Sequence, residues 1–111
     1  MIVMNIPDLV DQLVEHSNGV AAASRGKAFE TSVSKFTKTL ATVPDYPHAE
    51  MSQASFDLIN GLAEQVIAHV ERRIEESRDD ESLKEQMAES VYAIRRVLEE
   101  LFRWRRHFGR T

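Results

Sequence analysis

The sequence predicts an all-α fold, an antiparallel helical bundle in a single domain that spans residues 1–111. The first reason is that apolar residues recur at steps of three and four along four separate segments, which is the spacing of one helix face. The second is composition, because 42% of the residues are hydrophobic and 29% are charged, as in ordinary globular domains. The third is size, because 111 residues suffice for one modest core.

The first helix is predicted to be short, from about Pro7 to His16. Pro7 suits the first turn of a helix, and the pair Asn18-Gly19 suits a C-terminal stop. A helix of about ten residues is marginal on its own, so we expect it to brace the rest of the bundle. Its apolar face comprises Ile6, Leu9, Val10, Leu13 and Val14.

The second helix is predicted from an apolar stripe with steps of four, three, four and three. Ser and Thr residues between positions 31 and 42 lower its helix propensity, but the stripe lacks the alternation of a strand. Two starts are open, Val20 and Lys27, because Gly26 can either break the helix or mark a close helix crossing. The stripe comprises Phe29, Val33, Phe36, Leu40 and Val43.

The third helix follows residues 44–47, a loop whose two prolines end the second helix. We expect the third helix to start at about His48 or Ser52 and to reach Ile74, with Gly61 as its weak point. One face carries Met51, Ile59, Leu62, Val66, Val70 and Ile74, and Leu58, Ala63 and Ile67 widen it.

The chain is predicted to turn back before a fourth helix over residues 83–108. The segment 71–85 is nearly all polar, and the apolar stripe lapses between Ile74 and Leu83. Asp79, Asp80 and Ser82 are suitable N-cap residues for the fourth helix. The alternative is one continuous helix through residues 62–108, because no Gly or Pro intervenes, but the lapse in the stripe favours a hairpin.

The third and fourth helices form the spine of the predicted bundle, a long hairpin of coiled-coil type. The stripe of the fourth helix comprises Val91, Ile94, Leu98, Leu101 and Phe108, with Arg105 in the remaining step. It is wide, since Val97 and Phe102 flank it. Such stripes exceed what two shorter helices can cover, so we predict a homodimer through this hairpin.

Charge is unevenly distributed along the chain. Residues 1–94 hold 8 Lys and Arg against 16 Asp and Glu, whereas residues 95–111 hold 6 against 2. The two parts therefore carry net charges of −8 and +4. This asymmetry fits an anion-binding end, and it equally fits self-complementary packing in which the basic end meets an acidic flank of a neighbouring copy.

We expect a cytoplasmic protein without a membrane anchor. The sequence has no cysteine, and therefore no disulfide framework and no thiolate nucleophile. Residues 1–9 lack the basic start of a signal peptide, and Pro7 and Asp8 interrupt its apolar part. No segment approaches the roughly 20 apolar residues that cross a bilayer.

The candidate binding site is a basic cluster that comprises Arg103, Trp104, Arg106, His107 and Arg110. On a helical wheel its basic residues share an outward face with Tyr92, Arg96 and Glu99, opposite the apolar stripe. Guanidinium groups donate paired hydrogen bonds to phosphate or carboxylate, and an indole ring can stack on a base or a cation. The simpler interpretation is that basic residues stabilise and solvate the last turn of a helix.

The segment from Arg103 to His107 resembles, over five residues, the Arg and His pattern of the helical HEPN ribonucleases. In that family an Arg and a His of the pattern face each other across a dimer. Here three residues separate Arg103 from His107, fewer than in that family's pattern. Trp104 also stands where the family has a small polar residue. The activity is therefore not assigned, and a ribonuclease-like hydrolase remains the third functional hypothesis.

No motif supports a metal, a cofactor or a catalytic site. No histidine has a Glu three residues before it, as helical di-iron sites require. His48-Ala-Glu50 is similar to the start of a zinc deaminase motif, but the cysteines of that motif are missing. The acidic residues between 75 and 81 lack the glycine of a calcium loop. We therefore expect no cofactor and no metal.

The prediction for function is a non-enzymatic interaction protein, a small regulator, adaptor or inhibitor that self-associates and presents helix faces to a protein partner. The alternative is binding of a nucleic acid or a phosphate ligand through the basic cluster. The acidity of residues 1–94 disfavours this alternative, because a negative field repels a polyanion.

Overall fold

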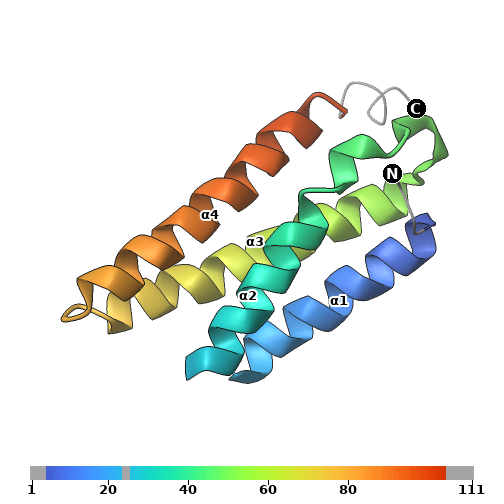
Figure 1. Ribbon diagram of the computed structural model, residues 1–111. Coiled ribbons are helices and arrows are strands. Elements are labelled where there is room, and N and C mark those ends of the chain that lie inside the picture. Colours follow the sequence, from blue (N-terminus) through green and yellow to red (C-terminus); the bar gives the residue numbers. More distant parts are fainter. Residues whose placement is uncertain (1–4, 24–25, 105–111) are drawn as a thin grey trace.

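The computed structural model describes residues 5–23 and 26–104, and in these residues it contains helices but no strand (Figure 1). The elements are α1 Ile6–Ala23, α2 Gly26–Leu40, the 3-10 helices η1 Val43–Asp45 and η2 His48–Glu50, α3 Gln53–Glu76 and α4 Glu81–Phe102. The all-α prediction is confirmed.

The helices form two antiparallel hairpins, α1–α2 and α3–α4, which pack against each other as a bundle (Figure 1). Helix α1 lies against α3, and α2 lies against α4. The molecule is elongated along the helix axes, with extents of 48 by 23 by 23 Å. The predicted antiparallel bundle, with the hairpin of the third and fourth helices in it, is confirmed.

The core lies between the two hairpins and consists of the predicted apolar stripes. Phe29 and Phe36 of α2 are fully buried, and burial of such side chains contributes roughly 1.5–3 kcal/mol each. Helix α3 buries Phe56, Ile59, Leu62, Ala63, Val66, Ile67 and Val70. Helix α4 buries only Met87, Ile94 and Leu101, while its Val91, Val97 and Leu98 are half-buried. Helix α4 therefore covers the core, but much of its own apolar surface is only partly buried.

The first helix is longer than predicted, because it continues through Asn18 and Gly19 to Ala23. Gly19 faces α2, where an added Cβ would lie 2.7 Å from the Ser32 Oγ atom. The glycine thus permits the close approach of α1 and α2, and it does not end the helix. Val20, one residue later, is fully buried and holds the last turn on the core. The predicted stop at Asn18-Gly19 is wrong for this reason.

Gly26 separates α2 from α1. Its φ angle of +82° is in the left-handed region, which glycine adopts without the steric cost of a Cβ. Helix α2 begins at this residue, so the start near Lys27 is confirmed over the start at Val20.

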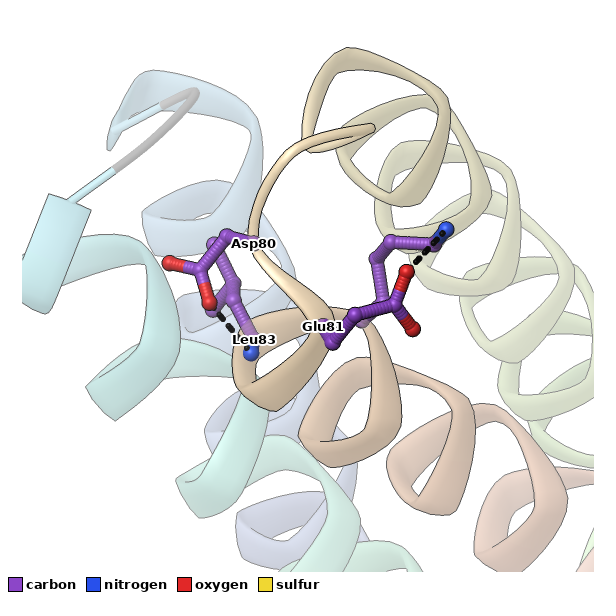
Figure 2. Close-up of polar contacts among 4 residues, drawn as sticks. Asp80, Glu81 and Leu83 are labelled. Atoms are coloured by element: carbon purple, nitrogen blue, oxygen red, sulfur yellow. Dashed lines mark hydrogen bonds and ion pairs between the residues drawn. The ribbon is translucent and has the colours of Figure 1, made fainter.

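The turn between α3 and α4 confirms the hairpin over a single continuous helix. Ser77 ends α3, and its buried hydroxyl donates to the Arg73 carbonyl oxygen at 2.7 Å. Asp80 is the N-cap of α4, and its carboxylate accepts a hydrogen bond from the Leu83 N–H at 3.0 Å (Figure 2). Glu81, in the first turn of α4, pairs with Lys84 at 3.4 Å (Figure 2). Of the three expected N-cap residues, Asp80 fills the position.

Helix α3 begins after Ser52, whose Oγ accepts from the Ser55 N–H at 3.1 Å. This confirms the later of the two predicted starts. Helix α4 ends at Phe102, earlier than the predicted Phe108, which lies outside the described residues together with Arg105. After Phe102 the chain makes a tight turn, in which the Trp104 N–H donates to the Leu101 carbonyl oxygen at 2.9 Å.

Candidate interaction site on helix α4

The predicted basic cluster is only partly described. Arg103 and Trp104 lie within the described residues, whereas Arg106, His107 and Arg110 lie outside them. The described residues therefore do not test whether the five side chains lie together, and the cluster stays a prediction. The pairing of Arg103 with His107 that a ribonuclease-like site requires is likewise outside the described residues.

Arg103 is exposed directly after α4, and its φ of −62° and ψ of −28° are still helical. It borders a polar hollow together with Arg96, Glu99 and Glu100. Two guanidinium groups thus flank two carboxylates along this surface of α4. Such a mixed surface attracts a polyanion much less than a purely basic one.

Trp104 packs against the core of the molecule. Its ring stacks on Phe56 near the start of α3, with ring centroids 6.3 Å apart and an interplanar angle of 21°. The side chain is half-buried against the core. Its indole therefore helps to hold the end of α4 on α3, and the role predicted for it in ligand stacking stays a prediction.

An open groove lies between α3 and α4 on the surface of the bundle. This α3–α4 groove has a volume of about 280 Å³ and is lined by Asn60, Glu64, Arg95, Leu98, Glu99 and Phe102. Leu98 is half-buried, and Phe102 is 64% exposed. The groove thus combines an apolar floor on α4 with polar side chains along both helices.

Two polar contacts fix the borders of the α3–α4 groove. The Asn60 amide donates to the Phe56 carbonyl oxygen at 2.8 Å, which holds Asn60 along α3. Arg95 of α4 pairs with Glu71 of α3 at 3.5 Å. Both members of this ion pair are about half exposed, so it contributes little stability and mainly positions the Arg95 side chain.

The outward side of α4 presents a second aromatic residue, Tyr92, which is 65% exposed. The Arg96 guanidinium carbon lies 5.9 Å from the centre of the Tyr92 ring, within the range of a cation–π contact. On the other side, Tyr92 borders a shallow hollow with Glu85, Ala88 and Glu89. Leu58 of α3, at 44%, is the third large apolar residue with high exposure in the described part of the chain.

Sequence reasoning placed Tyr92, Arg96 and Glu99 on one outward face, and the structure leaves all three exposed. It did not single out the α3–α4 groove. The available signal was the position of Phe102, which lies at the edge of the apolar stripe of α4 and not at its centre.

Within residues 5–23 and 26–104, no group of three or more His, Asp or Glu side chains is arranged to hold a metal ion. None of the helices in that part of the chain is both long enough and apolar enough to cross a membrane.

No protein-family model matches the chain, and comparisons with curated proteins and with solved structures find no significant similarity. Function is therefore inferred from the surface chemistry of the chain itself.

Proposed function

We propose that this protein is a non-enzymatic helical interaction module, of the regulator, adaptor or inhibitor type, that presents α4 to protein partners and to a second copy of itself. The observation that carries the proposal is the exposure of two aromatic residues on α4, Tyr92 at 65% and Phe102 at 64%. Aromatic side chains are enriched at protein interfaces, where they bury a large area at a small cost in conformational entropy.

A stripe on the outward face of α4 supports self-association. This outward stripe comprises Glu85, Glu89, Tyr92, Arg96, Glu99 and Arg103, all exposed and separated by steps of four, three, four, three and four. Steps of three and four are the spacing at which two helices meet in a coiled coil. The outward stripe therefore has the spacing of a helix–helix seam, although most of its members are charged.

The charges of the outward stripe favour an antiparallel pair. The stripe begins with Glu85 and Glu89 and ends with Arg103, so antiparallel pairing brings the acidic start of one α4 to the basic end of the other. With the twofold axis at position 94, Glu85 faces the partner's Arg103. In the same register Tyr92 faces the partner's Arg96, a cation–π pair. Both contacts occur twice because the interface is isologous.

One contact in this register is unfavourable. Glu89 faces the partner's Glu99, and like charges opposite each other weaken a helix pair. With Tyr92 as the only large apolar residue of the outward stripe, we expect a weak and reversible dimer, one that depends on protein concentration and weakens as salt screens its charges.

Sedimentation velocity over a wide range of concentration tests the proposal. We expect the mass to rise from 12.7 kDa towards twice that value, and Tyr92→Ser to shift the curve to higher concentration. Leu58→Ser is the matched control, because it removes an exposed apolar side chain from α3 and should leave the curve unchanged. A species of 12.7 kDa at every concentration would refute self-association.

The proposal places this module in the cytoplasm, on the basis of its cysteine-free composition. Fractionation of the source cells with an antibody to the protein tests this location, and recovery in a secreted or membrane fraction would contradict it.

A further inference from the structure

We infer that the α3–α4 groove is a docking site for a basic amphipathic helix of a partner protein. The inference rests on the proposed function and adds the chemistry of the partner. Two features of the groove carry it, an apolar floor and an acidic border on each side.

The apolar floor is formed by Leu98 and Phe102, which are four residues apart and therefore neighbours on one side of α4. Phe102 is 64% exposed, so covering it would remove a large apolar area from water. At about 280 Å³ the groove is at the small end for a site that encloses a small molecule. Its size instead suits anchoring side chains of a helix that lies along it.

The acidic border has a carboxylate on each helix, Glu64 on α3 and Glu99 on α4. Both side chains are exposed, and neither belongs to the two ion pairs found among the described residues. On α3 the acidic row extends by steps of seven to Asp57 and Glu71, both exposed. Seven residues correspond to about 10.5 Å along a helix and return to nearly the same side of it.

Arg95 is the basic residue that lines the groove, and it does not cancel this acidity. Its guanidinium pairs with Glu71 at 3.5 Å, so its charge is already matched within the acidic row. Glu99 shares a hollow with Arg96 and Arg103 on α4, so Glu64 is the carboxylate of the groove that remains to attract positive charge. An anionic or neutral helix would leave Glu64 without compensation, whereas a Lys or Arg side chain of a basic helix would pair with it.

The outward stripe of α4 leaves the groove accessible in the proposed dimer. Tyr92 is on the outward side of α4, whereas Leu98 and Phe102 are on the side next to α3. Glu99 borders both surfaces. Glu64, on α3, belongs to the groove alone and is therefore the cleanest site for a test.

The test uses two synthetic peptides with fluorescein labels. The first is an amphipathic helix of Leu and Lys, with Leu at helical spacing, and the second has Glu in place of every Lys. Fluorescence anisotropy with the full chain measures Kd. We expect the Lys peptide to bind, the Glu peptide not to bind, and Phe102→Ser to weaken binding by about tenfold or more.

The charge arm compares two double variants that remove equal charge. We expect Glu64→Gln with Glu99→Gln to weaken binding of the Lys peptide by about tenfold. The control, Asp11→Asn with Glu15→Gln, removes two exposed carboxylates from α1 and should change Kd by less than about twofold. Glu64→Gln alone should give a smaller loss in the same direction, and circular dichroism checks that each variant is folded.

Three results would overturn the inference. The first is equal weakening by the groove variants and the α1 control, which would mean that the peptide senses net charge only. The second is binding of the Glu peptide as tightly as the Lys peptide, and the third is no binding of the Lys peptide at low salt. None of these results bears on the self-association of the proposed function, which sedimentation measures separately.

Discussion

Trp104 packs the end of α4 against the start of α3. Its ring stacks on Phe56 with centroids 6.3 Å apart, and its side chain is half-buried. Helix α4 ends at Phe102, two residues before Trp104, and a tight turn there places the indole on α3. The contact with Phe56 gives Trp104 a packing role, and its predicted role in ligand binding stays a prediction.

Trp104→Ala should lower the free energy of unfolding by about 2 kcal/mol, less than for a fully buried tryptophan because the ring is only half-buried. Trp104→Phe keeps a ring against Phe56 and should lose less than half as much. Urea unfolding followed by circular dichroism measures both. Equal stability of Trp104→Ala and wild type would mean that the contact between Trp104 and Phe56 does not stabilise the fold.

Two glycines inside helices have opposite surroundings. An added Cβ at Gly19 would meet the Ser32 Oγ at 2.7 Å, whereas at Gly61 it would meet no atom within 4 Å. Gly61→Ala should therefore raise the free energy of unfolding by about 1 kcal/mol through helix propensity. Gly19→Ala should lower it by about 1 kcal/mol, because the clash outweighs the same gain in propensity. Urea unfolding that shows a gain for both variants would contradict the close approach of α1 and α2.

One side chain in the α3–α4 turn, Asp80, caps the start of α4. The Asp80 carboxylate accepts from the Leu83 N–H at 3.0 Å (Figure 2). This hydrogen bond satisfies a backbone donor at the start of α4 that has no partner within the helix. The cap thus determines where the chain leaves the turn and α4 begins.

Asp80→Ala should lower the free energy of unfolding by about 1 kcal/mol, the usual cost of losing an N-cap. Asp79→Ala is the control, because Asp79 is exposed in the turn and should change stability by less than half as much. Thermal unfolding of the two variants compares them directly. A larger loss for Asp79→Ala would mean that the cap is misassigned.

Sequence patterns predicted the elements that depend on local signals. The stripes through Phe36, Ile59 and Ile94 predicted three helices, and Asp80 marked the turn between the last two. The errors came from contacts that spacing does not reveal. Helix α1 continues past Gly19, where Ser32 of α2 approaches closely, and α4 ends two residues before Trp104, whose ring stacks on Phe56 of α3.

The candidate site was less predictable than the fold, for a physical reason. Helical spacing places a residue on a face, but the exposure of Phe102 depends on which neighbours cover that face. The outward residues Tyr92 and Arg96 were identified because the face opposite a core stripe is exposed in most helices. The α3–α4 groove required two helices to be placed side by side.

At the scale of the whole molecule, α4 differs from the other three helices in the described residues. It buries only Met87, Ile94 and Leu101, and it carries both highly exposed aromatic residues. One side of it borders the acidic α3–α4 groove, and the other carries the outward stripe of charges. Helix α4 thus closes the core and has two exposed surfaces of different chemistry.

The most direct test of the central claim is a gain of association. In the antiparallel register Glu89 faces the partner's Glu99, so Glu89→Lys replaces two repulsive contacts with two attractive ones. We expect sedimentation velocity to show dimers at a concentration about tenfold lower than for wild type, a change that unfolding does not mimic. Association unchanged or weakened by Glu89→Lys, in a variant with wild-type circular dichroism, would contradict the pairing of two copies through α4.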